Sequence, residues 1–164
     1  MTKVMLVEDD PLIIRLYDKT LKLAGYEVES ADNGLSALEQ LPHYMPQIIL
    51  LDIMMPTMNG VEFLNNMKKD ASVASIPVIV LTNVADSDVT MSAVDAGAAL
   101  VLIKSQTEPD DVVAAIQRVL NGEILQESTL DFEEQTPEEA APIPDAIPEE
   151  PVTEGTEPSP GQPV

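Results

Sequence analysis

The sequence contains no cysteine and only one histidine among its 164 residues. The absence of cysteine excludes disulfide bonds and thiolate metal sites. A single histidine excludes a metal site built from several imidazole ligands. A metal site in this chain would therefore depend on oxygen ligands.

Long apolar segments are also missing. No apolar run approaches the roughly 18–20 residues of a membrane-spanning helix. The N-terminal sequence MTKVMLVEDD has only a four-residue apolar run before its acids, which is too short for a signal peptide. We therefore expect a soluble, cytoplasmic protein.

Basic residues are scarce: 8 lysines and arginines stand against 29 acidic residues, and the formal net charge is −21. Such a surface repels phosphate backbones and anionic membranes, so we expect neither nucleic-acid nor membrane binding. No basic residue follows Arg118, and eleven acidic residues lie between Glu127 and Val164.

The composition changes near residue 123. The sequence EEQTPEEAAPIPDAIPEEPVTEGTEPSPGQPV is rich in proline and glutamate, and such a segment buries too little apolar surface to offset the entropy of ordering. We predict one folded domain over residues 1–122 and a disordered acidic tail over 123–164. The intervening EILQESTLDF could prolong the last helix, dock on the domain or bind a partner.

Residues 1–122 alternate apolar runs with amphipathic segments. The apolar runs predict five strands, at residues 4–7, 26–31, 47–52, 76–82 and 99–103. The amphipathic segments predict five helices, at residues 10–25, 33–41, 61–69, 87–97 and 107–122.

Two helices carry specific expectations. In the first, Leu12, Leu16 and Leu23 are expected to lie on the apolar face that packs on the core. In the last, Thr107 is expected to be the N-cap, with Asp110 as its capping-box partner.

Strands and helices that alternate at this spacing imply a parallel sheet covered by helices on both faces. The segment 26–31 is the only strand with alternating polarity, so it should form an edge. The continuous apolar runs of the first, third and fourth strands suit central positions. We therefore predict a doubly wound α/β fold of the flavodoxin-like type, with strand order 2-1-3-4-5.

Polar residues stand where four of these strands end. The first strand is followed by Glu8 and Asp9, the third ends in Asp52, the fourth in Thr82, and the fifth is followed by Lys104. Alone, each has an ordinary explanation as a cap or a surface residue. Because parallel strands bring these ends to one edge of the sheet, their joint occurrence predicts a site.

Three carboxylates at this edge would repel one another. Each like-charged pair at about 4–5 Å costs roughly 3–4 kcal/mol at an effective dielectric near 20, so the cluster should raise its pKa values or bind a cation. Oxygen ligands favour Mg²⁺. A carboxylate beside Mg²⁺, a lysine and a hydroxyl can attack phosphorus to give an aspartyl phosphate.

The chain resembles the receiver domain of two-component response regulators over roughly residues 3–122. The resemblance rests on MLVEDDP, LLDIMMPTMNG, IPVIVLT and GAALVLIK, including the D-x-x-x-P-x-x-x-G spacing of Asp52, Pro56 and Gly60. It also rests on the intervals of 43 residues from Asp9 to Asp52 and of 22 residues from Thr82 to Lys104.

The resemblance implies that Asp52 is the phosphoacceptor and attacks the phosphorus of a phosphohistidine on a partner. It implies that Thr82 and Lys104 contact the phosphoryl group. For Mg²⁺ it implies Asp9 and Asp52 as ligands, Glu8 through a bound water, and Met54 through its backbone carbonyl.

Several positions depart from the family pattern. Val101 replaces the usual aromatic residue three positions before the lysine, Ser105 replaces a cis-proline, and Asn83 replaces a small residue. We expect a trans peptide bond before Ser105. We also expect that phosphorylation is signalled by a change other than the movement of an aromatic side chain. Because neither Met54 nor Val84 can orient water by hydrogen bonding, we also expect slow self-dephosphorylation.

The expected function is phosphorelay signalling. The donor would be a sensor histidine kinase or a histidine phosphotransfer protein, and the output would be a change in protein contacts without a DNA-binding domain. We expect no enzymatic turnover beyond slow self-phosphotransfer and autodephosphorylation, and a monomer or a weak, phosphorylation-dependent dimer. A degenerate receiver that binds partners without phosphorylation remains the alternative. A dehalogenase-type phosphohydrolase is disfavoured, because that class needs a polar acid–base residue at position 54.

Overall fold

The computed structural model describes residues 1–83 and 86–123. All of the described residues belong to one compact unit. The predicted tail lies almost entirely outside the described residues, and so does Val84. Within the described part of the chain, no helix combines the length and the apolar character that crossing a bilayer requires.

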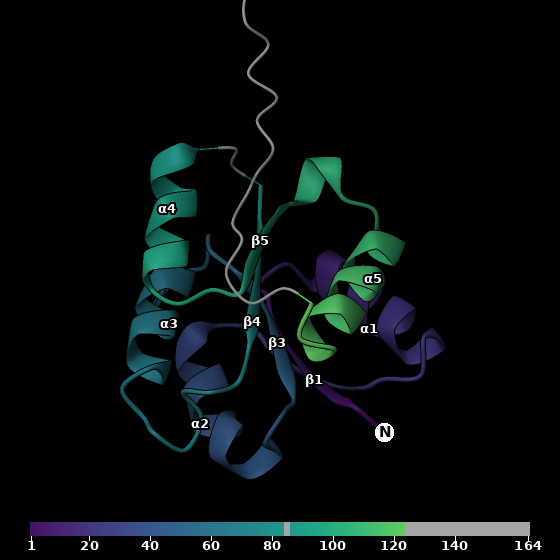
Figure 1. Ribbon diagram of the computed structural model, residues 1–164, viewed down its shortest axis with the longest axis horizontal. Coiled ribbons are helices and arrows are strands. Elements are labelled where there is room, and N and C mark those ends of the chain that lie inside the picture. The colour runs from purple at the N-terminus through teal and green to yellow at the C-terminus, as the bar shows by residue number, and fades with distance from the viewer. Residues whose placement is uncertain (84–85, 124–164) are drawn as a thin grey trace, which may run out of the picture. The chain divides into compact units, whose positions relative to one another are not determined.

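Five strands and five α-helices alternate along the chain (Figure 1), as the apolar pattern predicts. The strands are β1 Lys3–Val7, β2 Glu27–Ala31, β3 Ile48–Asp52, β4 Val78–Thr82 and β5 Leu100–Ile103. The helices are α1 Pro11–Leu23, α2 Gly34–Tyr44, α3 Gly60–Met67, α4 Ser87–Asp95 and α5 Pro109–Leu120, and a short 3-10 helix, η1, covers Lys104–Gln106.

All strand pairs are parallel, and the sheet has the predicted order β2-β1-β3-β4-β5. The flavodoxin-like α/β fold is thereby confirmed. Every residue of β3 and β4 is buried, whereas β2 is mostly exposed along its length. This contrast explains the sequence pattern, because a central strand is covered by helices on both faces and an edge strand is not.

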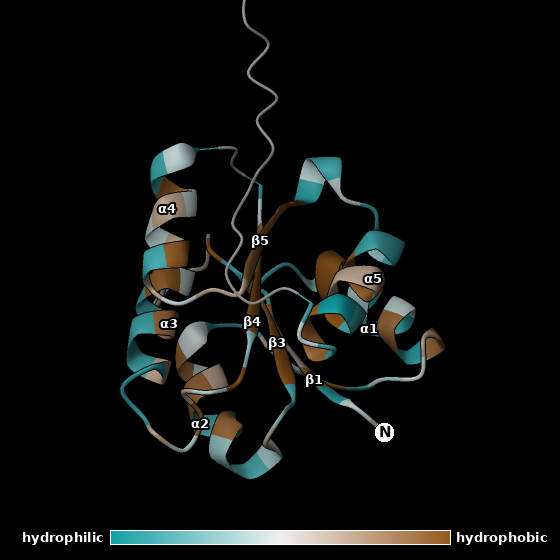
Figure 2. Cartoon of the chain, in the orientation of Figure 1, coloured by the Kyte–Doolittle hydropathy of each residue, from teal (hydrophilic) through white to brown (hydrophobic). Residues whose placement is uncertain are grey.

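Two hydrophobic cores lie on the two faces of the sheet. One core joins the strands to α2, α3 and α4 and contains Phe63, Leu64 and Met67. The other joins them to α1 and α5 and contains Leu21 and Ile116. Figure 2 shows the strands as the most hydrophobic part of the fold, with polar residues on the outer faces of the helices. The sheet is therefore anchored on both sides, and its ends are held in fixed positions.

The predicted apolar face of α1 is wrong. Leu12 and Leu23 expose 71% and 80% of their surface, and Leu16 is also exposed. The buried residues of this helix are instead Tyr17 and Leu21. The helix carries two apolar stripes, and packing against the sheet and α5 selects the stripe that contains Tyr17 and Leu21.

The predicted cap of α5 is displaced by one residue. Glu108, not Thr107, precedes the helix, and its backbone N–H donates a hydrogen bond of 2.9 Å to the carboxylate of Asp111. Asp110 lies in the first turn but is not the partner. The displacement follows from Pro109, which fits the first helical position because it has no N–H to satisfy.

Candidate functional site

The polar residues at the strand ends lie at one edge of the sheet. Strand register pairs Val7 with Leu51, Asp52 with Leu81, and Thr82 with Ile103. Glu8 and Lys104 directly follow the first and last of these strands, so the four strands deliver their functional residues to the same level. The spatial part of the sequence prediction is therefore correct.

The loop from β3 to α3 folds back tightly on the residue it follows. The Gly60 N–H donates a hydrogen bond of 2.9 Å to the carbonyl of Ile53. A Cβ atom on Gly60 would lie 2.5 Å from the carbonyl oxygen of Asp52 and 2.8 Å from the Cα of Ile53. Only glycine permits this approach, so Gly60 fixes the backbone that carries Asp52.

Three carboxylates converge at this edge. One ligand oxygen from each of Glu8, Asp9 and Asp52 lies within 4.8 Å of the others. Glu8 and Asp52 expose only 2% and 4% of their surface, whereas Asp9 is exposed. Asp10 has a different role: its side chain accepts a hydrogen bond of 2.8 Å from the Leu12 N–H and caps α1. The cluster is therefore two buried acids with an exposed third acid at its mouth.

Lys104 is the cation of this cluster. Its Nζ donates a hydrogen bond of 2.5 Å to Glu8 Oε2 and lies 3.4 Å from Asp52 Oδ1. The second contact has the distance of an ion pair, but Asp52 Oδ1 accepts no hydrogen bond and is buried. One ammonium thus serves two buried carboxylates and leaves one oxygen of Asp52 incompletely satisfied.

The charges shift one another's protonation. Burial raises the pKa of Asp52, although the charge of Lys104 and the backbone N–H groups of Met54 and Ile53 act against it. Burial also raises the pKa of Glu8, against the hydrogen bond from Lys104. Burial alone would lower the pKa of Lys104, but its hydrogen bond to Glu8 and the charges of both acids raise it. The lysine therefore stays protonated, whereas burial disfavours the charged forms of the two acids.

The remaining predicted residues lie nearby. Thr82 is fully buried at the end of β4. The side chain of Met54 is 59% exposed, and its carbonyl's predicted role as a metal ligand stays a prediction. Val101 is buried in the core on the α4 side of the sheet. No cis peptide bond occurs among the described residues, so the expected trans bond before Ser105 is confirmed.

Sequence reasoning missed two features of the site. The partner of Lys104 at hydrogen-bond distance is Glu8 rather than Asp52. Tyr17 of α1 is buried close enough to the site for the charges of Lys104 and Glu8 to act on its pKa, which burial raises. Neither feature has a signal in the sequence. The motifs do not show which acid Lys104 bonds, and an aromatic residue on an amphipathic helix is typical of a core.

The site meets the chemical requirements of a hard divalent cation. Among the described residues, the donors of this cluster are carboxylate oxygens, with no cysteine or histidine, which is the ligand set that suits Mg²⁺. A divalent ion would also offset the repulsion between Glu8, Asp9 and Asp52, which Lys104 alone does not neutralise. The residues therefore fit the predicted Mg²⁺.

Comparison with known proteins places this arrangement in a family. The family model described as the response regulator receiver domain matches residues 4–117. Among solved structures, the chemotaxis protein CheY4 of Vibrio cholerae is 31% identical, with a TM-score of 0.69 over 73% of this chain and 98% of that chain.

Curated relatives are longer. The transcriptional regulatory protein CpxR homolog of Haemophilus influenzae is 43% identical over 82 residues, which are 50% of this chain and 34% of that protein. The probable transcriptional regulator ycf29 of Pyropia yezoensis is 34% identical over 78% of this chain and 57% of that protein. The chain thus spans between a third and just over half of these relatives. The expected absence of nucleic-acid binding therefore stays a prediction.

Proposed function

The chain belongs to the response regulator receiver family, and from that premise we propose that it accepts a phosphoryl group on Asp52. The donor is the phosphohistidine of a sensor histidine kinase or a histidine phosphotransfer protein. The acceptance requires Mg²⁺, and it changes the contacts that the domain makes with other proteins.

The observation that carries this proposal is the state of Asp52. Its carboxylate is buried, its pKa is raised by burial, and Oδ1 accepts no hydrogen bond. This buried carboxylate lies 3.4 Å from the Lys104 ammonium and clusters with oxygens of Glu8 and Asp9, so a cation and a set of metal-binding acids stand beside the nucleophile. Strand β3 and the loop closed by Gly60 hold it in place, which favours in-line attack.

The transfer exchanges one bond for another. An oxygen of Asp52 forms a bond to phosphorus while the phosphorus–nitrogen bond of the donor histidine breaks, and the imidazole keeps the electron pair. The product is an acyl phosphate, which adds negative charge beside Lys104. Lys104 compensates this charge, and the Thr82 hydroxyl donates a hydrogen bond to a phosphoryl oxygen.

Asp9, Asp52 and the Met54 carbonyl would hold Mg²⁺, with Glu8 acting through a bound water. The ion supplies positive charge where negative charge develops on the transferred group. The exposed position of Asp9 leaves this side of the site open to a partner.

The domain does not turn over a substrate in this proposal. It is a phosphoacceptor whose own activity is confined to slow self-phosphotransfer and autodephosphorylation. Its output is protein contact as a cytoplasmic monomer or a weak, phosphorylation-dependent dimer. Asp86, Asp88 and Asp95 make α4 acidic, which works against a symmetric dimer through this helix.

Phosphotransfer profiling tests the proposal. Purified histidine kinases and phosphotransfer proteins from the source organism are phosphorylated and mixed with the full chain in Mg²⁺. Transfer from a subset of donors to the chain, and none to Asp52→Asn, is expected. Equal labelling of that variant would place the acceptor elsewhere.

A phosphorylation-independent binding module is the second candidate. It is favoured by Val101, Ser105 and Asn83, which replace residues typical of the family switch. The two candidates separate with beryllofluoride, which mimics the acyl phosphate. A module of this kind would show no Mg²⁺-dependent response to beryllofluoride and would keep its partner affinity in Asp52→Asn.

A further inference from the structure

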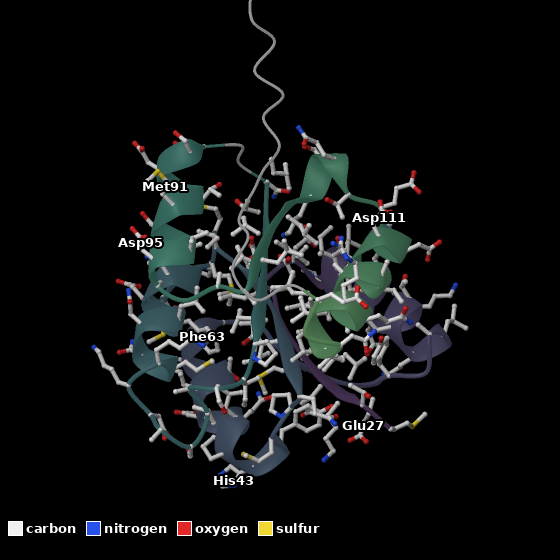
Figure 3. All side chains as sticks on the ribbon, viewed as in Figure 1. Glu27, His43, Phe63, Met91, Asp95 and Asp111 are labelled. Carbon is white, nitrogen blue, oxygen red and sulfur yellow. The ribbon has the colours of Figure 1, made fainter. Side chains whose placement is uncertain are left out.

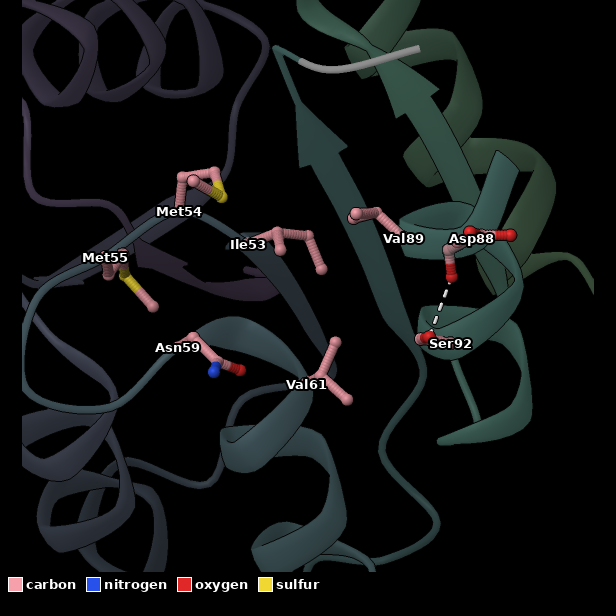
Figure 4. Close-up of a pocket in the computed structure, with 8 residues that line it drawn as sticks. All are labelled: Ile53, Met54, Met55, Asn59, Val61, Asp88, Val89 and Ser92. Carbon is pink, nitrogen blue, oxygen red and sulfur yellow. Dashed lines mark hydrogen bonds between the residues drawn. The ribbon is translucent and has the colours of Figure 1, made fainter. Parts of the chain in front are cut away.

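A pocket of about 680 Å³ lies between the β3–α3 loop, the first turn of α3 and α4. Figure 4 shows Ile53, Met54 and Met55 on one side and Asp88, Val89 and Ser92 of α4 on the other. The volume is within the range of about 300–1,000 Å³ that is typical of ligand pockets. Of the residues that line it, the proposed phosphoryl transfer uses only Met54, through its backbone carbonyl.

The pocket has an apolar interior with an adaptable rim. Ile53 and Met55 are buried, whereas the Met54 side chain is 59% exposed at the surface. Val61 and Val89 are partly buried on opposite sides. Because methionine side chains are flexible and polarizable, such a rim can adjust to an inserted apolar group.

Most polar groups of the pocket are already satisfied within the fold. Asn59 exchanges hydrogen bonds of 2.9 and 3.0 Å with Glu62 in the capping box of α3. The Ser92 hydroxyl donates a 2.7 Å hydrogen bond to the Asp88 carbonyl. The Asp88 carboxylate, in contrast, makes no hydrogen bond or ion pair with the described residues. Among the described residues that line the pocket, it is the one charged side chain, and it remains available to a partner.

Charge decides among the possible occupants. The described residues of α4 and its N-cap include Asp86, Asp88 and Asp95 and no basic residue (Figure 3 labels Asp95 on this helix). A second copy of the chain carries a net charge of −21, and residues 124–164 contain acids but no basic residue. Like charges therefore oppose both of these occupants, whereas a basic segment is attracted.

A small metabolite also fits less well than a side chain. Ligand pockets orient small molecules through several convergent polar groups, and this pocket offers one unpaired carboxylate. An apolar side chain in the interior with a basic residue beside Asp88 uses both features at once.

We propose that this pocket docks a segment of a partner protein that carries an apolar anchor side chain flanked by basic residues. The anchor packs against Val61, Val89 and the methionines, and a flanking lysine or arginine pairs with Asp88. The docking does not require phosphorylation of Asp52, so its test is independent of the proposed phosphoryl transfer.

The test uses the full, unphosphorylated chain and a short synthetic peptide with one central phenylalanine flanked by lysines. Binding is followed by the methyl NMR signals of the methionines at near-physiological salt, which screens long-range attraction. Saturable shifts of Met54 and Met55 are expected. Replacing the phenylalanine of the peptide by alanine should weaken binding about tenfold or more.

Matched variants locate the contact. Asp88→Asn should weaken binding by up to about fivefold, whereas Asp95→Asn makes the same charge change on the same helix outside the pocket and should have no effect. Val89→Thr keeps the side-chain volume and should also weaken binding. Equal loss in both aspartate variants, or equal binding of a peptide with glutamates in place of lysines, would overturn the proposal. Two results without peptide would also overturn it. Methyl shifts that change with protein concentration would indicate a second copy in the pocket, and shifts caused by removal of residues 124–164 would indicate that this segment occupies it.

Discussion

Lys104 Nζ lies 2.5 Å from Glu8 Oε2 and 3.4 Å from Asp52 Oδ1, so one buried ammonium holds the two buried acids of the site together. The arrangement leaves the Oδ1 atom of Asp52 without a hydrogen bond, whereas Glu8 Oε2 accepts one from Lys104. The same lysine therefore affects both the stability of the fold and the reactivity of the Asp52 carboxylate.

Removing the lysine should destabilise the fold. Lys104→Met leaves Glu8 and Asp52 without a cation, and breaking a buried pair typically costs about 3–5 kcal/mol. Urea unfolding at neutral pH measures this loss. Lys22→Met is the control, because its ion pair with Asp18 is exposed and should contribute less than about 1 kcal/mol. Equal costs for the two variants would contradict the assigned role of Lys104.

Neutralising Asp52 should stabilise the protein at neutral pH. Because burial raises the pKa of Asp52 above its ordinary value of 3.8, the folded protein binds a proton there more readily than the unfolded chain. The free energy of unfolding therefore falls as pH rises from 3.8 through the raised pKa. Asp52→Asn should be more stable than the parent above this window by about 1 kcal/mol or more, and equal to it below.

Unfolding curves of both proteins across this pH range measure the difference. The exposed Asp95→Asn serves as the control and should change stability by less than about 0.5 kcal/mol at every pH. If Asp52→Asn were less stable than the parent at neutral pH, the ionised Asp52 carboxylate would not lower the free energy of unfolding, and the prediction would be wrong.

Magnesium should stabilise the chain through the acidic cluster. A ligand at about ten times its dissociation constant adds roughly 1.4 kcal/mol to the free energy of unfolding. Asp9→Asn should remove most of this gain without unfolding the protein, because Asp9 is exposed. Thermal unfolding with and without Mg²⁺ measures it, and Asp95→Asn should keep the full response. An unchanged response in Asp9→Asn would exclude Asp9 as a ligand.

Gly60 should tolerate no side chain. In Gly60→Ala the new Cβ would lie 2.5 Å from the Asp52 carbonyl oxygen, and such overpacking costs about 1–3 kcal/mol or more. It should also displace Asp52 and slow phosphorylation. Gly25→Ala has open space but a φ of +90°, so it should cost about 1–2 kcal/mol and leave phosphorylation unchanged. Normal phosphorylation of Gly60→Ala would refute the positioning role.

The acyl phosphate should be long-lived. Met54 directly flanks the site and cannot orient a water by hydrogen bonding, so the phosphorylated chain should persist for minutes or longer in Mg²⁺. Met54→Gln supplies an amide of similar size and should shorten the lifetime severalfold. Decay of the parent within seconds would contradict this expectation.

The sequence predicts the fold well because burial on two faces leaves a clear pattern. The continuous apolar runs of β3 and β4 could only be central strands, and their polar ends located Asp52 and Thr82. In α1, by contrast, two apolar stripes compete, and only packing against the sheet shows that Tyr17 and Leu21 are buried while Leu12 is exposed.

The parts of the site that escaped prediction depend on distances. The motifs place Glu8, Asp52 and Lys104 at one edge, but they do not show which acid the lysine bonds. The pocket beside α4 also has no motif. It arises where Met54 and Val89, 35 residues apart in the chain, come to line the same space.

The central claim is that Asp52 takes up phosphorus in a Mg²⁺-dependent reaction. The most direct measurement is the intact mass of the full chain after incubation with acetyl phosphate, followed by peptide mapping. The account predicts a mass increase of one phosphoryl group on the peptide that contains Asp52, in Mg²⁺ and not in its absence. It also predicts no increase in Asp52→Asn. A phosphoryl group on another residue, or an unmodified chain in Mg²⁺, would contradict it.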